Sequence, residues 1–393
     1  MSAVDDVPRA LLGVRLWPRE RVLFVLRWIA VVVWASVIVY RTATDGFAFN
    51  RELLLLYIST GLLAASIGQG RRMLYVIRDW LPFALVLIAY DLSRGAADFV
   101  GRPTLWHWQA DADRWLFGGD MPTVWLQERL KMPRAPWWEV GISTVYMSFF
   151  ILPYVIAGVL WLRNRDEWKR FVRLFVGLSF AALVVYALVP AAPPWAAARC
   201  TATDVADGPS GPRCMFRSAR DVPDGGILGA MQQTQDGAND WVERIVTRGW
   251  GKLNLHSASA LLDQGQASVN LVAAIPSLHA GMSAALAAFL WHRIDRRWRP
   301  LLVAYVLIMA FTLVYTAEHY VIDILLGWAF AAVVIYGFHR YDVWRSRPSR
   351  AGEIDLPESL GDGPDRLGAF GEPNDVARAD ADRRAVVGEL DSR

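Results

Sequence analysis

Long apolar stretches recur along the whole chain. Hydrophobic residues make up 54% of its 393 positions, and a helix of about 20 apolar residues crosses the roughly 30 Å hydrocarbon core of a bilayer. The candidate stretches are 22–41, 52–69, 76–93, 140–162, 170–190, 275–292, 300–316 and 319–338. We therefore expect an all-α fold, a polytopic membrane helix bundle with about eight transmembrane helices.

Basic residues alternate between the connections and indicate how the helices are oriented. Lysine and arginine concentrate in the cytoplasmic loops of membrane proteins. Here they precede the first stretch, follow the last one and occupy the even-numbered connections. These connections contain Arg71, Arg72, Arg163, Arg165, Lys169, Arg170, Arg293, Arg296, Arg297 and Arg299. Both termini are therefore predicted to be cytoplasmic, and the odd-numbered connections extracytoplasmic.

The composition divides the chain into three parts. Residues 1–21 are predicted to be a cytoplasmic leader and 22–345 a transmembrane catalytic domain. Residues 346–393 have few large apolar side chains and should form a disordered cytoplasmic tail. Within the domain, the tryptophan-rich segment 95–138 is expected at the outer interface, as a roof over the site or as a plain anchor. The connection 191–270 is expected to form an extracytoplasmic loop that acts as a lid or substrate platform.

The loop 191–270 holds both cysteines of the chain, Cys200 and Cys214. In an oxidising compartment they can form a disulfide that closes a loop of about 15 residues. Two free thiols are the alternative. The second half of the same loop, 239–263, has apolar residues at roughly helical spacing and is expected to be helical.

Two short strings place histidines at the outer ends of apolar helices. PSLHAG at 276–281 contains His279, and EHYVID at 318–323 contains His319 and Asp323. Residues four apart lie one helical turn apart on the same face, so Asp323 can orient the His319 ring. Ionisable groups at membrane helices are costly unless they line a cavity or do chemistry. Either histidine alone would more simply be structural, but together they indicate phosphoryl transfer through a phosphohistidine.

Other residues of these strings fit the same chemistry. Ser277 can direct its hydroxyl to a phosphate oxygen, and the helix that follows offers backbone N–H groups to an anion. No cluster of His, Asp or Glu with metal-ligand spacing accompanies them, so we expect neither a metal nor another cofactor. The arginines are explained by topology, which leaves nucleic-acid binding without support.

At this point the chain resembles a known family. PSLHAG and EHYVIDILLG, preceded by VPAAPPW at 189–195, look like the type-2 phosphatidic acid phosphatase superfamily. The strings LFGG at 116–119 and YDLSRG at 90–95 are similar to those of its inositol phosphorylceramide synthase-like branch. The resemblance covers roughly residues 75–340. It implies a bundle of transmembrane helices with a metal-independent active site at one membrane face.

The resemblance also implies roles for three residues. His319 would be the nucleophile, Asp323 would orient it, and His279 would be the general acid/base. The chain departs from the wider superfamily in its basic residues. It has AAPPW where related phosphatases carry a Lys-x6-Arg-Pro string, and Thr312 and Leu313 where they carry Ser-Arg.

Positive charge must still neutralise the transferred phosphoryl group. The outer-side candidates are Arg94, Arg199, Arg213, Arg217, Arg244, Arg248 and Lys252. The residues predicted to bind substrate are Ser277, Arg94, Lys252, Arg248 and Tyr315. The carboxylate of Glu318, beside His319, has no assigned role at this stage.

These features predict a membrane-embedded lipid phosphotransferase that acts on a lipid phosphate or phospholipid at the extracytoplasmic face. A lipid phosphate or polyprenyl phosphate phosphatase, with water as acceptor, is the alternative. A proton-coupled transporter is less favoured because the ionisable groups gather at helix ends and no repeat is visible; an inactive scaffold is a further possibility. The Arg-, Ala- and Trp-rich composition resembles that of a high-GC bacterium, so together with the apolar stretches it predicts an integral protein of a bacterial cell membrane. The oligomeric state is left open.

Overall fold

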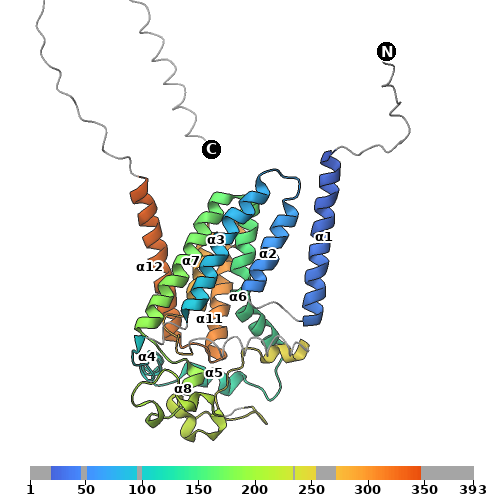
Figure 1. Ribbon diagram of the computed structural model, residues 1–393. Coiled ribbons are helices and arrows are strands. Elements are labelled where there is room, and N and C mark those ends of the chain that lie inside the picture. The colour runs from blue at the N-terminus through green and yellow to red at the C-terminus, as the bar shows by residue number, and fades with distance from the viewer. Residues whose placement is uncertain (1–18, 46–50, 95–99, 233–234, 254–270, 347–393) are drawn as a thin grey trace, which may run out of the picture. The chain divides into compact units, whose positions relative to one another are not determined.

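The described part of the chain consists of helices and loops. The computed structural model describes residues 19–45, 51–94, 100–232, 235–253 and 271–346. Its α-helices are α1 (Arg19–Asp45), α2 (Arg51–Ala65), α3 (Arg72–Arg94), α4 (Trp108–Leu116), α5 (Pro122–Leu130), α6 (Trp138–Arg163), α7 (Arg165–Leu188), α8 (Pro194–Ala197), α10 (Leu278–Leu290), α11 (Arg299–Tyr315) and α12 (Val321–Arg345) (Figure 1). These ranges contain isolated bridges but no strand. Most of the predicted leader and nearly all of the predicted tail lie outside the described residues.

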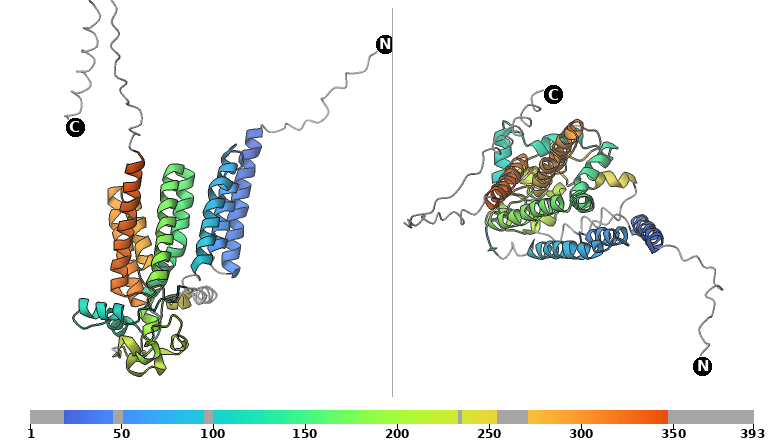
Figure 2. Two further views of the ribbon diagram at one scale, coloured as in Figure 1. Left: turned by 60° about the vertical axis from the view of Figure 1, so that its left-hand side comes forward. Right: turned by 90° about the horizontal axis from the view of Figure 1, so that it is seen from above.

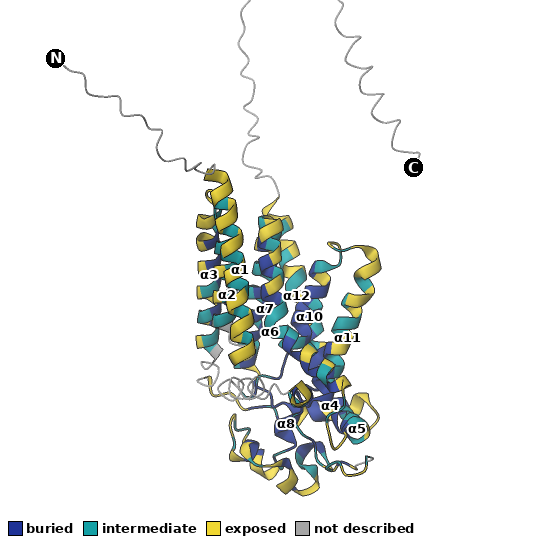
Figure 3. Cartoon of the chain, turned by 90° about the vertical axis from the view of Figure 1, so that its right-hand side faces the viewer, coloured by how far each residue is buried: buried dark blue, intermediate teal, exposed yellow. Residues whose placement is uncertain are grey.

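The long helices are suited to a bilayer. Six of them, α1, α3, α6, α7, α11 with the turn before it, and α12, are long and apolar enough to cross a membrane. Two shorter apolar helices, Leu53–Ala65 and Leu278–Leu290, lie within α2 and α10. The long helices expose large apolar side chains, such as Val32 and Val39 of α1 and Leu74 of α3 (Figure 3). The chain is therefore an integral membrane protein. Its helices also confirm the prediction of an all-α bundle. The count of eight spans and the side of each terminus stay predictions.

The helices that carry the two histidine strings pack at the centre of a contact network. α10 contacts α11, α12, α6 and α7; in addition α11 contacts α6, and α12 contacts α7. α2 and α3 contact α6 and α7 from the other side, and α1 contacts α2 (Figure 2). Small residues let helix backbones approach closely in membranes. Gly281 of α10 and Gly327 of α12 face each other: a Cβ on Gly281 would lie 2.9 Å from the Gly327 carbonyl oxygen.

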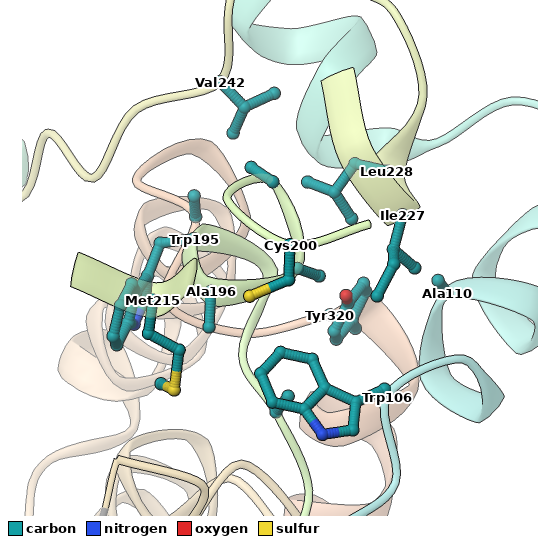
Figure 4. Close-up of a cluster of buried hydrophobic side chains, with 14 of the residues drawn as sticks. Trp106, Ala110, Trp195, Ala196, Cys200, Met215, Ile227, Leu228, Val242 and Tyr320 are labelled. Atoms are coloured by element: carbon teal, nitrogen blue, oxygen red, sulfur yellow. The ribbon is translucent and has the colours of Figure 1, made fainter. Parts of the chain in front are cut away.

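A layer of short helices and loops covers one end of the bundle, where α4, α5 and α8 lie (Figure 1). Its core surrounds the Cys200–Cys214 disulfide, whose Cα atoms are 5.1 Å apart. Trp195, Met215 and Tyr320 are among the buried side chains of this cluster (Figure 4). The layer therefore has a core of its own, built mainly from loop 191–232 and completed by residues in and beside α4 and α5 and by Ala317 and Tyr320, which precede α12.

Loop residues 239–253 differ from the helix expected there. They form turns and a short 3-10 helix, η6 (Arg248–Leu253), while 254–263 lie outside the described residues. Tertiary contacts override the helical spacing. Lys131 binds the side chain of Asn239 and the carbonyl of Trp241, and Arg248 binds the buried Glu139. These bonds hold the loop against α5 and α6 in an irregular path.

Candidate functional site

The two histidines lie next to each other at the covered end of the bundle. His279 is in the first turn of α10, and His319 lies two residues before α12. Their ring centroids are 5.7 Å apart, with the planes inclined by 58°. The separation leaves both rings within reach of one small group bound between or beside them. We refer to these two residues as the histidine pair.

Asp323 supports His319 from the first turn of α12. One of its carboxylate oxygens, Oδ2, lies 3.5 Å from His319 Nδ1, and the Asp323 side chain is fully buried. The same oxygen accepts the backbone N–H of Tyr320 at 3.0 Å. The Asp323 carbonyl accepts the N–H of Ser277, also at 3.0 Å. Asp323 therefore connects the His319 ring, the start of α12 and the start of α10.

His319 is not in the helix that contains Asp323, in contrast to the sequence expectation. The chain leaves α11 through Ala317, which has a φ of +61°, a conformation rare for residues other than glycine. The N–H groups of Glu318 and His319 then both donate to the Leu313 carbonyl, at 2.9 and 3.1 Å. His319 thus belongs to a tight turn, residues 316–320, which we call the histidine turn.

Aromatic side chains of α6 hold the His279 ring. Tyr146 stacks on it with centroids 4.8 Å apart, and Phe149 lies 4.1 Å away. Phe150 approaches edge-on at 5.7 Å. The sequence alone did not single these out, because aromatic residues three and four apart are common in any apolar helix. The His279 ring is therefore packed between these aromatic rings and His319.

Ser277 begins α10 and is fully buried. Its hydroxyl oxygen accepts the N–H of Ala280 at 3.3 Å, which makes it the N-cap of the helix. The hydroxyl proton can still be donated to another acceptor. A phosphate contact by Ser277 stays a prediction.

Two arginines gather beside the histidine turn. Arg244 binds both carboxylate oxygens of Glu318, with N···O distances of 2.6 and 3.0 Å. The guanidinium groups of Arg244 and Arg199 lie 5.2 and 5.3 Å from the centre of the Trp195 ring. Trp195 in turn donates its backbone N–H to the Ala317 carbonyl at 3.0 Å. The Arg244 pair gives Glu318, which had no assigned role, a clear partner.

The proximity of these cations makes the region attractive to an anion. Burial lowers the pKa of Arg199 below its ordinary value, and the charge of Arg244 lowers it further. Two guanidinium groups that repel each other are stabilised when a phosphate binds both. Both residues were among the sequence candidates, but nothing in their spacing distinguished them from the other five.

The other predicted substrate-binding residues lie elsewhere or have other partners. Arg248 binds Glu139, with one N···O distance of 2.8 Å, and the Tyr315 hydroxyl donates to Glu139 at 2.7 Å. Lys252 is exposed, with its ammonium 5.5 Å from the centre of the Trp137 ring. Arg94 is the last residue of α3, and its side chain lies outside the described part. The structure thus assembles Ser277, His279, His319 and Asp323, and adds Arg244 and Arg199.

The described residues contain no group of three or more His, Cys, Asp or Glu side chains placed to hold a metal ion. What they define is a membrane helix bundle with two imidazoles, a supporting carboxylate and a pair of guanidinium groups at one end. The family model of the PAP2 superfamily matches residues 108–337, more than half of the chain. The chain belongs to the PAP2 superfamily. No curated protein and no solved structure matches it.

Membership in this superfamily indicates phosphatase or phosphotransferase activity of a general kind. The match spans α4 to α12 and includes both histidine strings. It does not extend to a particular branch, so the inositol phosphorylceramide synthase-like assignment stays a prediction.

Proposed function

We propose that the protein transfers a phosphoryl or phospho-headgroup unit from a membrane lipid through a phosphohistidine at His319. The observation that supports this proposal most strongly is the histidine pair, with ring centroids 5.7 Å apart and Asp323 behind only one of the rings. This asymmetry suits a nucleophile and a separate acid/base, because each needs a different protonation state. The basic connections at the opposite end of the bundle favour an extracytoplasmic site.

The first half-reaction begins with attack by His319. Asp323 faces Nδ1, which keeps the proton on that nitrogen and leaves the Nε2 lone pair available. Nε2 forms a bond to phosphorus while the bond from phosphorus to the leaving oxygen breaks. His279 donates a proton to that oxygen, so the lipid part departs as an alcohol. Asp323 stabilises the positive charge that the His319 ring acquires.

The second half-reaction reverses these roles. His279, now neutral, takes a proton from the acceptor hydroxyl as its oxygen attacks phosphorus. The P–N bond breaks and His319 is regenerated. An alcohol acceptor gives a new phosphate ester. Water gives inorganic phosphate from a phosphoryl intermediate, or the headgroup phosphate if a phospho-headgroup was transferred. We favour the transferase outcome on the resemblance to the synthase-like branch, with the lipid phosphatase as the alternative.

The acceptor can be identified from product masses. Purified protein in detergent is incubated with a panel of lipid phosphates and phospholipids, in ¹⁸O-labelled water, with and without inositol, glycerol or a sugar. A transferase produces an acceptor phosphate ester that lacks the label, and a phosphatase produces labelled inorganic phosphate. Vanadate, which adopts the trigonal-bipyramidal geometry of the transition state, should inhibit both reactions. Turnover that vanadate does not affect would contradict the phosphohistidine mechanism.

Arg244 is expected to bind the transferred phosphoryl group. Arg244→Gln should lower kcat/KM by about 10²–10³-fold, the range seen when one charge-stabilising donor is removed from a transition state. Lipid phosphate turnover measures the effect. Arg220→Gln is the matched control, because Arg220 lies in the same loop region with an exposed side chain and should leave turnover unchanged.

A double variant separates this role from simple charge pairing with Glu318. If Arg244 only neutralises Glu318, then combining Arg244→Gln with Glu318→Gln removes both charges and restores activity. If Arg244 binds phosphate, the double variant stays as slow as Arg244→Gln alone. Recovery to near wild-type kcat/KM would therefore rule out Arg244 as a phosphate ligand.

A further inference from the structure

The histidine turn is held on both sides by the segment that contains α4 and α5. These helices precede the turn by almost 200 residues and belong to the tryptophan-rich segment expected at the membrane interface. α4 contacts α12, and α5 contacts α11. Among the fully buried polar side chains of these helices are Asp113 from α4 and Gln127 from α5, which bond to the chain on either side of the turn.

Asp113 caps the helix that follows the histidine turn. Its two carboxylate oxygens accept the backbone N–H groups of Val321 and Ile322, each at 2.9 Å. These are the first two residues of α12. The N–H of Tyr320, one residue earlier, is taken by Asp323. Two buried carboxylates from different helices therefore accept the free backbone N–H groups at the start of α12, where the helix dipole favours negative charge.

Gln127 holds the chain on the other side of the histidine turn. Its amide nitrogen donates to the carbonyl of Tyr315 at 2.8 Å and to that of Glu243 at 2.7 Å. Its amide oxygen accepts the N–H of Glu243 at 3.0 Å. Tyr315 is the last residue of α11, and Glu243 precedes Arg244. One side chain thus fixes the entry to the histidine turn and the position of the loop arginine.

We propose that Asp113 and Gln127 are positioning residues that fix the histidine turn, and with it His319, relative to His279. This inference rests on the proposed function for its catalytic consequence. The turn carries a residue in a sparsely populated backbone conformation, Ala317, and so needs external contacts to stay in place. A displacement of about 1 Å in a reacting group can cost about a hundredfold in rate.

We call the contacts of Asp113 and Gln127 with the two sides of the histidine turn the clamp. The charge of Asp113 also makes this clamp sensitive to pH. Burial raises the pKa of the Asp113 carboxyl to about 6, and the charge of Asp323 adds to this, although the two backbone N–H groups act in the opposite direction. Tyr320 is buried near Asp113 and also interacts with Asp323, Arg114 and Asp111. The titratable groups of the histidine turn, His319 and Glu318, face Asp323 and Arg244. Because the folded value lies above the ordinary one, this group favours folding below pH 3.8, and that contribution is lost as the pH rises through about 6. Acidification below about pH 6 therefore neutralises the Asp113 carboxylate that caps α12, and this protonation does not itself destabilise the fold.

Hydrogen exchange tests the clamp without requiring activity. Peptides that cover residues 313–325 of the full-length protein in detergent are compared for wild type, Asp113→Asn, Asp113→Ala and Gln127→Ala. We expect faster exchange in all three variants. Asp111→Asn is the matched control, because Asp111 lies in the same helix, is 67% exposed and pairs only with Arg114 among the described groups; it should exchange as wild type does. Size-exclusion profiles identify any variant that fails to fold. The exchange rates of the remaining variants then test whether Asp113 and Gln127 hold the histidine turn.

Kinetics test the consequence for the reaction. Asp113→Asn and Gln127→Ala should lower kcat of phosphoryl transfer by about 10- to 100-fold with little change in KM. The ratio of wild-type to Asp113→Asn activity should approach one well below pH 6, where the wild-type cap is also uncharged. Unchanged exchange in the folded variants would overturn the clamp. Faster exchange with unchanged kcat would overturn the positioning role, whereas wild-type protein that shows the clamp but no phosphoryl transfer would refute the proposed function alone.

Discussion

His319→Asn should abolish phosphoryl transfer, with a loss of about 10⁴-fold or more, because no other group can form the covalent intermediate. Asparagine keeps a polar side chain of similar reach beside Asp323 but offers no nucleophilic ring nitrogen. Rapid acid-free quenching and mass spectrometry of the intact chain should detect a phosphohistidine in wild type during turnover and none in this variant. Phosphoenzyme that still forms in His319→Asn would contradict the assignment.

His279→Asn should behave differently, because its role is proton transfer. Loss of a general acid/base typically costs about 10²–10⁴-fold. The first step of this variant should recover with a leaving group that needs no proton, such as p-nitrophenolate. The second step still lacks its base, so the phosphoenzyme should accumulate. His292→Asn is the matched control, since His292 is exposed beyond the C-terminal end of α10, and it should retain wild-type turnover.

The helices of this protein could be predicted because a helix that crosses the hydrocarbon core needs about 20 predominantly apolar residues in succession. Each of the eight apolar stretches coincides with a helix of the structure. The stretch 52–69 corresponds to α2, one of the two helices whose apolar part is shorter than a membrane span. Hydropathy therefore locates helices well, but it does not decide which of them cross the bilayer.

The histidine pair could be found for a related reason. His279 and His319 stand out as polar residues beside apolar runs, and Asp323 follows at a helical spacing. Their actual geometry was less accessible. His319 precedes α12 because Ala317 adopts a positive φ, and sequence patterns place glycine, not alanine, at such positions. A left-handed alanine is set by its surroundings, here the Leu313 carbonyl, which accepts two N–H groups.

The groups around the pair depend on tertiary contacts that no spacing reveals. Arg244 follows no periodic pattern, and only its ion pair with Glu318 places it beside the histidine turn. Arg248 lies one helical turn later in sequence but binds Glu139. Asp113 is an acidic residue in a short helix that would ordinarily be solvated, yet it is fully buried against the start of α12. Long-range pairing of this kind requires the fold.

A close glycine contact holds α10 against α12. The start of α10 carries Ser277 and His279, and α12 carries Asp323 and directly follows the histidine turn. The distance between these two helices therefore contributes to the distance between the rings. A Cβ on Gly327 would overlap the Ser277 carbonyl oxygen, which belongs to the backbone and has little freedom to move. Gly337 lies ten residues later in the same helix, and a Cβ there would meet nothing within 4 Å.

Gly327→Ala should therefore separate α10 from α12 and reduce phosphoryl transfer at least about a hundredfold, since a shift of about 1 Å between reacting groups has that effect. Overpacking should also destabilise the fold by about 1–3 kcal/mol, measurable as a lower thermal midpoint in detergent. Gly337→Ala adds the same methyl group to the same helix, and alanine is the better helix former. It should leave turnover unchanged and the midpoint equal or higher. Equal behaviour of the two variants would show that the backbone contact does not set the spacing of the histidine pair.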